Sequence, residues 1–161
     1  MQDNLIVRLS GVNIFQKDHL ILRSVNLRIN QGEFVYLIGK TGSGKSSLLK
    51  TLYGALPLVE GNGQVAGFNL NELGRRNIPL LRRKLGIVFQ DFNLLSDRTV
   101  EENLRFVLEA TNWTDEAAMK GRMKEVLEQT ALQGQEHKMP HQLSGGEQQR
   151  VVIARALLNR P

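Results

Sequence analysis

The sequence predicts an α/β fold with a helical part, and three observations support this. Short β-rich runs fill the first half of the chain, a glycine-rich loop joins one run to a helix, and helical periodicity dominates after about residue 99. With 161 residues, of which 41% are hydrophobic, the chain can bury a sizeable core. We expect a single domain with an α/β core and an antiparallel β portion over about residues 5–89. A helical subdomain over about 90–143 and a helix over 144–161 that returns to the core complete it.

The β portion is predicted from runs in which β-branched and other apolar residues alternate with polar ones. Such runs cover residues 5–9, 25–29 and 64–66. Alternation with a period of two is typical of strands that have one buried face. These runs therefore predict the antiparallel strands.

The glycine-rich loop over residues 39–46 reads GKTGSGKS and matches the phosphate-binding pattern G-x-x-x-x-G-K-[ST]. It directly follows the apolar run 34–38, which predicts a buried strand between Gly32 and Gly39. Residues 45–53 carry apolar residues at helical spacing, so the loop ends at a helix N-terminus. Free backbone N–H groups and the positive end of the helix dipole favour a polyphosphate there.

The roles within this loop follow from the same pattern. Lys45 is expected to reach the β- and γ-phosphates of a nucleotide, and the Ser46 hydroxyl to bind Mg²⁺. The alternative is an ordinary glycine-rich turn after a strand, which the full match and its setting disfavour. The residues expected to bind the nucleotide are Gly39, Lys40, Thr41, Gly42, Ser43, Gly44, Lys45, Ser46 and Ser47.

A second helix start that could bind an anion lies at residues 143–149, which read LSGGEQQ. Ser144 is a good N-cap, Gly145 and Gly146 expose backbone amides, and an apolar stretch follows over 151–158. Taken alone, this segment could be a capped core helix without any ligand.

Two further helices are predicted between these motifs. Thr99 can cap a helix that has Glu101 and Glu102 in its first turn, where carboxylates are favourable. Asp115 can cap a second helix that runs towards Leu127. Trp113 is expected to pack between the two helices.

The order of three motifs resembles that in the ATP-binding cassette (ABC) ATPases: the loop 39–46, Gln90 after a predicted strand over residues 86–89, and LSGGEQQR over 143–150. The resemblance covers about residues 5–161 and implies the P-loop core of that family. Segments 34–39 and 89–100 are most similar to the FtsE-type cell-division ATP-binding proteins, which partner the membrane protein FtsX. This resemblance implies that the parent protein is an ATPase, that it lies at the inner face of the cell membrane and that it drives an FtsX-like partner. The alternatives are a subunit of another ABC transporter, such as a lipoprotein or macrolide exporter, and a binding-only module.

The same resemblance implies roles for residues outside the loop. Gln90 is similar to the glutamine that senses Mg²⁺ and the γ-phosphate and moves with the membrane partner. Phe15 resembles the aromatic residue, more often Tyr, that stacks on adenine, although it could also be a core residue. Phe92, Leu94 and Leu95 lie where the family receives a helix of its membrane partner, and they too could be core. The signature residues expected to contact ATP of the opposite subunit in a head-to-tail homodimer are Leu143, Ser144, Gly145, Gly146, Glu147 and Gln148.

The chain departs from the family pattern at its end. After Pro161 the family continues into a strand that carries an Mg²⁺-binding Asp, then a catalytic Glu and later a switch His. His19, His137 and His141 precede that point and are expected at the surface. Because positioning and charge stabilisation carry phosphoryl transfer, we expect this piece to bind nucleotide with negligible turnover. The strands on either side of the missing strand would lack hydrogen-bond partners. We therefore expect this piece to be marginally stable and prone to aggregation or to swapping of segments between copies.

Composition excludes several other classes. The chain has no cysteine, which excludes disulfides and cysteine-based metal sites, and its net charge is +5. The basic residues are dispersed without interleaved aromatic residues, so we expect no nucleic-acid partner. The clusters at 75–76 and 82–84 are read as a solvated face or a contact with anionic lipid. No signal peptide or long apolar stretch occurs. A chromosome-maintenance ATPase is disfavoured because no sustained heptads separate Gln90 from Leu143.

Overall fold

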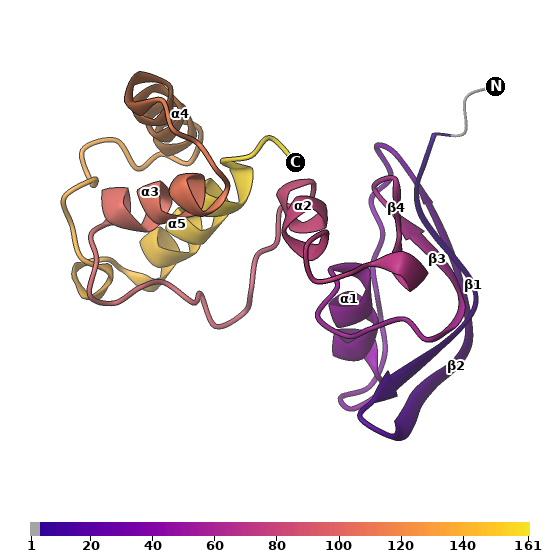
Figure 1. Cartoon of the computed structure of the whole chain (residues 1–161). Helices are drawn as coiled ribbons and strands as arrows, with labels where there is room; N and C mark the ends of the chain where they lie inside the picture. Colours follow the sequence, from indigo (N-terminus) through magenta and orange to yellow (C-terminus); the bar gives the residue numbers. More distant parts are fainter. Residues whose placement is uncertain (1–3) are drawn as a thin grey trace. The chain divides into compact units, whose positions relative to one another are not determined.

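A computed structural model describes residues 4–161 and divides the chain into two compact units, of which one ends at Arg82 and the other begins at Arg83. Each unit is described by itself. In the first unit, the described residues form a four-stranded sheet of order β2-β1-β3-β4 in which all neighbours are antiparallel (Figure 1). The strands are β1 (Leu5–Gln16), β2 (His19–Asn30), β3 (Glu60–Val65) and β4 (Phe68–Asn69).

Strands β1 and β2 form a long hairpin whose register runs from the pair Leu5–Asn30 to the pair Gln16–His19. Several register shifts interrupt it, and Lys17 in the turn has a φ of 55°. The strands include the predicted runs 5–9 and 25–29, and β3 includes most of the run 64–66. The antiparallel β portion is therefore confirmed, and its hairpin is longer than the sequence pattern indicated.

The helices of the first unit are α1 (Lys45–Leu52), the 3-10 helix η1 (Leu70–Glu72) and α2 (Ile78–Arg83), which ends at the boundary between the units. Helix α1 packs against β1 and buries Leu48 and Thr51. The predicted helix after the glycine-rich loop is confirmed. The other buried apolar side chains of this core are Leu9, Val12, Ile14, Leu58, Val65, Leu70 and Leu81.

The apolar run 34–38 is not a buried strand, and that prediction is wrong. It lies outside the sheet, and all five of its side chains are exposed, from 44% for Leu37 to 88% for Ile38. The rings of Phe34 and Tyr36 meet edge to face with centroids 4.9 Å apart, as expected for residues i and i+2 on one face of an extended chain. An apolar run indicates a tendency to be buried, but a strand also needs a hydrogen-bonded neighbour.

The run 86–89 in the second unit also lies outside any strand, so the strand predicted before Gln90 is wrong as well. Its last two side chains, Val88 and Phe89, are exposed. The division between the units at residues 82 and 83 lies slightly before this run, whereas the change in sequence pattern lies near residue 89.

The second unit is helical. It contains α3 (Val100–Ala110), α4 (Glu116–Gln129), the 3-10 helix η2 (Pro140–Gln142) and α5 (Gly145–Leu157), and the three α-helices pack on one another. The helix starts predicted at Thr99, Asp115 and Ser144 are confirmed as N-caps. Trp113 packs against the shared core, which is built from Val100, Leu104, Leu108, Met119, Met123, Val126, Leu127, Leu132, Leu143, Val151, Ala154 and Leu158.

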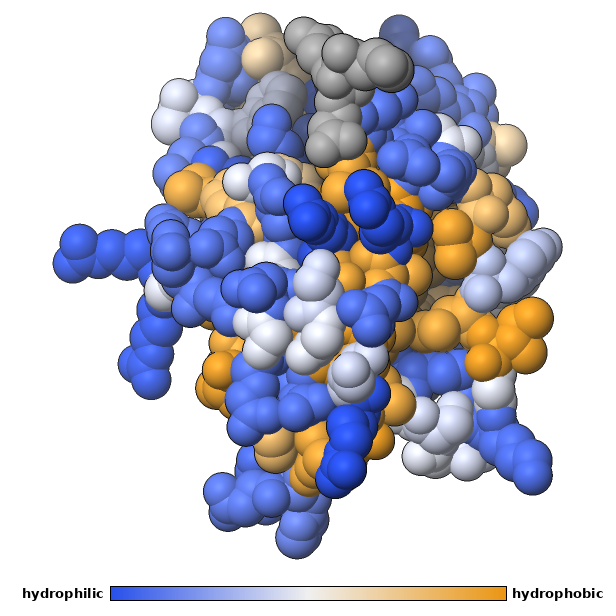
Figure 2. Space-filling model, turned by 90° about the vertical axis from the view of Figure 1, so that its right-hand side faces the viewer, coloured by the Kyte–Doolittle hydropathy of each residue, from blue (hydrophilic) through white to orange (hydrophobic). Residues whose placement is uncertain are grey.

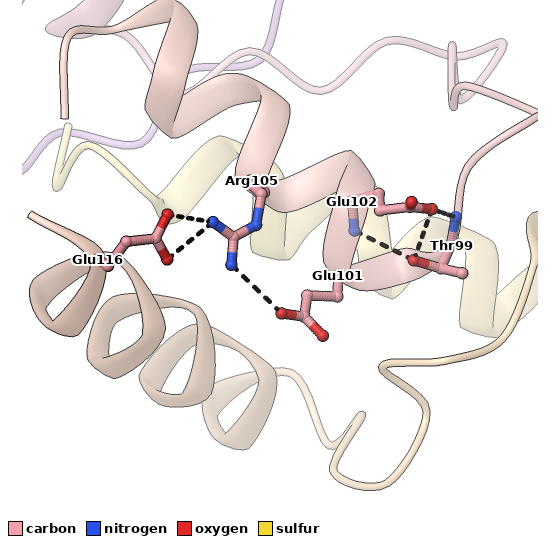
Figure 3. Close-up of polar contacts among 5 residues, drawn as sticks. All are labelled: Thr99, Glu101, Glu102, Arg105 and Glu116. Carbon is pink, nitrogen blue, oxygen red and sulfur yellow. Dashed lines mark hydrogen bonds and ion pairs between the residues drawn. The ribbon is translucent and has the colours of Figure 1, made fainter. Parts of the chain in front are cut away.

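Polar contacts fix the start of α3 and join it to α4 (Figure 3). Thr99 accepts a hydrogen bond from the Glu102 amide, while the Glu102 carboxylate accepts one from the Thr99 amide. The bond from the Thr99 amide, followed by a second one from the Thr99 hydroxyl at 3.0 Å, lowers the pKa of Glu102. Arg105 of α3 donates to Glu116 of α4 at 2.7 Å and pairs more distantly with Glu101. The ion pair between Arg105 and Glu116 thereby links the second turn of α3 to the first turn of α4.

The surface mixes apolar and polar side chains, and Figure 2 shows hydrophobic residues among charged ones on one face. His19, His137 and His141 are exposed, as predicted. Within residues 4–161, no helix has the length and hydrophobicity needed to cross a bilayer.

Candidate nucleotide-binding site

The loop over residues 39–46 curls tightly before α1. Gly42 and Gly44 have φ values of 81° and 91°, in the left-handed region that favours glycine. The Ser43 amide donates to the Lys40 carbonyl at 3.1 Å, which closes a turn. A Cβ atom on Gly39 would lie 2.8 Å from Ser43 Oγ. The backbone conformation therefore favours glycine at positions 42 and 44, whereas a side chain at position 39 requires the Ser43 hydroxyl to move.

The N-terminus of α1 is left open, in contrast to the starts of α3 and α5. No side chain caps α1, its first turn holds no acidic residue, and Gly44 stands at its N-cap position. The first amide bonded within the helix is that of Leu48, which donates to the Gly44 carbonyl. The three preceding amides, those of Lys45, Ser46 and Ser47, have no intrahelical acceptor. Such a helix start suits an anionic ligand.

Lys45 supplies the positive charge of this site. Its Nζ atom donates to the carbonyls of Gly39 and Lys40 at 2.7 and 2.8 Å, so the ammonium group is held against the loop. Ser46 is exposed directly beside it. Backbone amides, an ammonium group and a hydroxyl form a donor set that fits a polyphosphate, and the hydroxyl oxygen of Ser46 fits as one ligand of Mg²⁺.

Phe15 lies in the same unit as this loop, near the end of β1, and its side chain is half-buried. It lines a surface hollow of about 510 Å³ together with residues of the segment after α1, among them Pro57 and Val59. The glycine-rich loop touches the hairpin nearby, because a Cβ atom on Gly44 would lie 2.9 Å from Leu22. An aromatic ring with aliphatic neighbours is a surface on which a base can stack. The adenine role of Phe15 stays a prediction.

The other predicted site residues belong to the second unit. Gln90 is exposed and precedes the loop that leads to α3. Leu143 is buried, whereas Ser144, Gly145 and Gly146 are exposed at the start of α5. The structure therefore groups the phosphate-loop residues with Phe15 in one unit, and Gln90 with the signature residues in the other.

The start of α5 is closed by a capping box. The Ser144 hydroxyl donates to Glu147 at 2.6 Å and accepts a longer bond from the Glu147 amide. The hydrogen bond from the Ser144 side chain, followed by the one from its backbone, lowers the pKa of Glu147. Gln148 donates its side-chain amide to the Leu143 carbonyl. The signature segment is thus held by its own side chains.

One residue near Gln90 was missed from the sequence. Arg155 of α5 donates to the carbonyls of Phe92 and Asn93, two and three positions after Gln90. The available signal was the position of Arg155 as the one charged residue in the otherwise apolar stretch 151–158. Phe92, Leu94 and Leu95 are half-buried, and Leu94 packs against the helical core. For Leu94 the structure thus favours the core alternative.

Comparison with known proteins adds a family match. A family model described as "ABC transporter" matches residues 22–161. The chain is 42% identical over 140 residues to the cell division ATP-binding protein FtsE of Streptococcus pneumoniae strain D39, a match that covers 87% of this chain and 60% of that protein. It is 44% identical over 137 residues to the methionine import ATP-binding protein MetN of Halalkalibacterium halodurans, covering 85% and 40%. The chain thus spans only part of the length of these relatives.

Solved structures of the same family also match this chain. The dimeric structure of MJ0796, described as a bacterial ABC transporter cassette, matches with a TM-score of 0.84 and 35% identity, covering 97% of this chain and 71% of that one. A second structure of MJ0796, in a post-hydrolysis state bound to ADP and Pi, matches with a TM-score of 0.83.

Proposed function

Because the chain belongs to the ABC transporter family, we propose that it forms the ATP-binding part of an ABC-type ATPase that acts with a membrane partner. The observation that carries this proposal is the open start of α1. Its amides are uncapped, its first turn has no carboxylate, and the Lys45 ammonium lies against the loop that precedes it. A triphosphate supplies the negatively charged acceptor oxygens for these amides and for the ammonium group.

We assign the site residues to different parts of the bound nucleotide. The amides at the start of α1 and the ammonium group of Lys45 hold phosphate oxygens, and Ser46 offers its hydroxyl to Mg²⁺, with Gln90 as a second Mg²⁺ contact. Phe15 stacks on the base. A bound Mg²⁺ ion supplies charge neutralisation between the β- and γ-phosphates. Ser144 and the amides of Gly145 and Gly146 serve the nucleotide of a second copy in a head-to-tail homodimer. The dimeric structure of the MJ0796 cassette supports the formation of a dimer.

For the biological role, we propose an FtsE-type subunit. It works at the cytoplasmic face of the cell membrane, where ATP hydrolysis by the whole protein drives an FtsX-like partner in cell division. The similarity to FtsE of S. pneumoniae over 140 residues supports this. The similarity to MetN favours a second candidate, the ATPase subunit of a substrate importer.

Co-purification of the full-length protein from its native membrane separates the two roles. We expect an FtsX-like membrane protein to be retained through solubilisation. Retention of only an importer permease would contradict the cell-division role and support the second candidate.

The binding site itself is tested by Lys45→Ala. Removing the ammonium group should weaken binding of fluorescent ATP with Mg²⁺ by tenfold or more, because charge-assisted hydrogen bonds to phosphate are among the stronger polar contacts. Lys50→Ala is the matched control, because Lys50 lies on the same helix at its last turn and is exposed. Its affinity should stay within about twofold of the unmodified chain. Equal affinities for all three proteins would overturn the proposal.

A further inference from the structure

The guanidinium group of Arg155 joins α5 to the loop that follows Gln90. Its two terminal nitrogens donate to the carbonyls of Asn93 at 2.6 Å and Phe92 at 2.8 Å. The side chain is half-buried, and the resulting desolvation lowers the pKa of Arg155. Arginine nonetheless keeps its charge in proteins, so both hydrogen bonds are charge-assisted. This contact connects the helix of the signature motif with the backbone next to Gln90.

The backbone at this contact is strained. Phe92 and Asn93 have φ values of 52° and 50°, so two successive residues other than glycine adopt the left-handed conformation. The Asn93 amide also donates to the Asp91 carbonyl, two residues back, which tightens the turn around Phe92. Left-handed conformations are unfavourable for residues with a Cβ atom and persist only where surrounding groups hold them. The two carbonyls of these residues are the ones to which Arg155 donates.

The far end of the same loop is fixed by a different helix. Asn103 of α3 is buried and accepts a hydrogen bond from the Leu95 amide at 2.8 Å. Its side-chain amide donates to the carbonyls of Leu95, Arg98 and Thr99. The loop is thus tied to α3 at one end and to α5 at the other. The part nearest to Gln90 is held through Arg155.

We propose that Arg155 is a positioning residue that fastens the backbone beside Gln90 to the signature helix, so that the two move together. A displacement of α5 is carried by the guanidinium group to Phe92 and Asn93, and from there along the chain to Gln90. The link within the second unit stands on its own contacts. Its consequence for ATP turnover rests on the proposed function.

Hydrogen exchange followed by mass spectrometry tests the link. Arg155→Met keeps most of the side-chain length and removes both donors, so amides of residues 91–95 should exchange on the order of tenfold faster or more. Arg155→Lys keeps the charge but not the planar pair of donors and should give an intermediate rate. Arg105→Met is the control, because Arg105 pairs with Glu101 and Glu116 and should leave residues 91–95 unchanged.

Exchange at residues 91–95 that matches the unmodified protein in both Arg155 variants would overturn the link. Arg155→Met could instead raise exchange throughout the second unit, which would indicate a general loss of stability. In that case Arg155→Lys tests the link, and faster exchange confined to residues 91–95 in this variant supports it.

Kinetics of the full-length protein test the consequence. Arg155→Met should lower kcat for ATP hydrolysis at least fivefold, while ATP affinity stays within about twofold, because the phosphate loop lies in the other unit. Partial recovery of kcat in Arg155→Lys supports positioning. Faster exchange with an unchanged kcat would overturn the transmission to Gln90. If the unmodified protein does not bind ATP, or binds it no more tightly than Lys45→Ala does, the proposed function is overturned. The exchange result would still stand in that case.

Discussion

Ala131 occupies the position just past the end of α4, where helices most often carry glycine. Its amide donates to the Glu128 carbonyl, and the next amide, that of Leu132, donates to Leu127, which is the Schellman pattern of hydrogen bonds. Helices α1 and α3 end in the same way, with Gly54 and Asn112 at this position. All three residues have a positive φ, at 71° for Gly54, 63° for Asn112 and 53° for Ala131. Of these three residue types, alanine is the least suited to a positive φ, because glycine has no Cβ atom and asparagine tolerates the left-handed conformation.

Ala131→Gly should therefore stabilise the protein. Relief of the left-handed strain outweighs the greater freedom of glycine in the unfolded chain, so we expect the free energy of unfolding to rise by about 0.5–1 kcal/mol. Urea denaturation followed by the fluorescence of Trp113 measures it. Gly54→Ala should have the opposite sign, since its Cβ atom would also lie 2.7 Å from Leu73. A loss of stability in Ala131→Gly would contradict this explanation of the helix end.

At the scale of elements, the helix starts differ in whether a side chain caps them. Helices α3 and α5 close their first turns with a Thr or Ser and a Glu, and α4 uses Asp115. Helix α1 has neither a capping side chain nor a carboxylate. A capped start satisfies its own amides, whereas an uncapped one leaves them for a ligand. This contrast within one chain distinguishes the proposed phosphate site from starts that are closed by their own side chains.

The cap of α5 should make stability depend on pH. Because the folded protein lowers the pKa of Glu147, this carboxylate contributes stability that is fully present above its unfolded pKa of about 4.3. The contribution is lost as the pH falls through the lower pKa of the folded state. Glu147→Gln should thus reduce the free energy of unfolding at pH 7 and have a much smaller effect near pH 2.5, as measured by urea denaturation at both values.

Ser144→Ala provides the control for this prediction. If the hydroxyl of Ser144 is the main cause of the shift, Glu147→Gln should cost less stability at pH 7 when Ser144 is already replaced. The same loss in both backgrounds, or at both pH values, would contradict the assigned cause.

At the scale of the whole molecule, the sequence predicted the helices well and the strands unevenly. Thr99, Asp115 and Ser144 could be recognised because capping is local chemistry, read from a few neighbouring residues. Strands within β1 and β2 were predicted from the alternation along residues 5–9 and 25–29, whereas their pairing as one long hairpin was not. The runs 34–38 and 86–89 failed because strand formation depends on a hydrogen-bonded neighbour, which a local pattern does not specify.

The candidate site shows the same division. The phosphate loop could be read from its pattern because its glycines, Lys45 and Ser46 are contiguous in the sequence. The contact of Arg155 with Phe92 and Asn93 joins residues more than 60 positions apart, with sequence separations of 62 and 63. Nothing in the local sequence of α5 indicates which carbonyls its arginine reaches. Long-range polar contacts of this kind need the folded chain.

The five exposed side chains at 34–38 have a practical consequence for any solution measurement on this chain. An extended apolar segment with solvent-facing backbone is a template for pairing between copies, and such pairing grows with concentration. Self-association would remove chains from the nucleotide equilibrium and mimic weak affinity. Titrations should therefore be repeated over a dilution series and checked by light scattering, so that only constants independent of chain concentration are compared between variants.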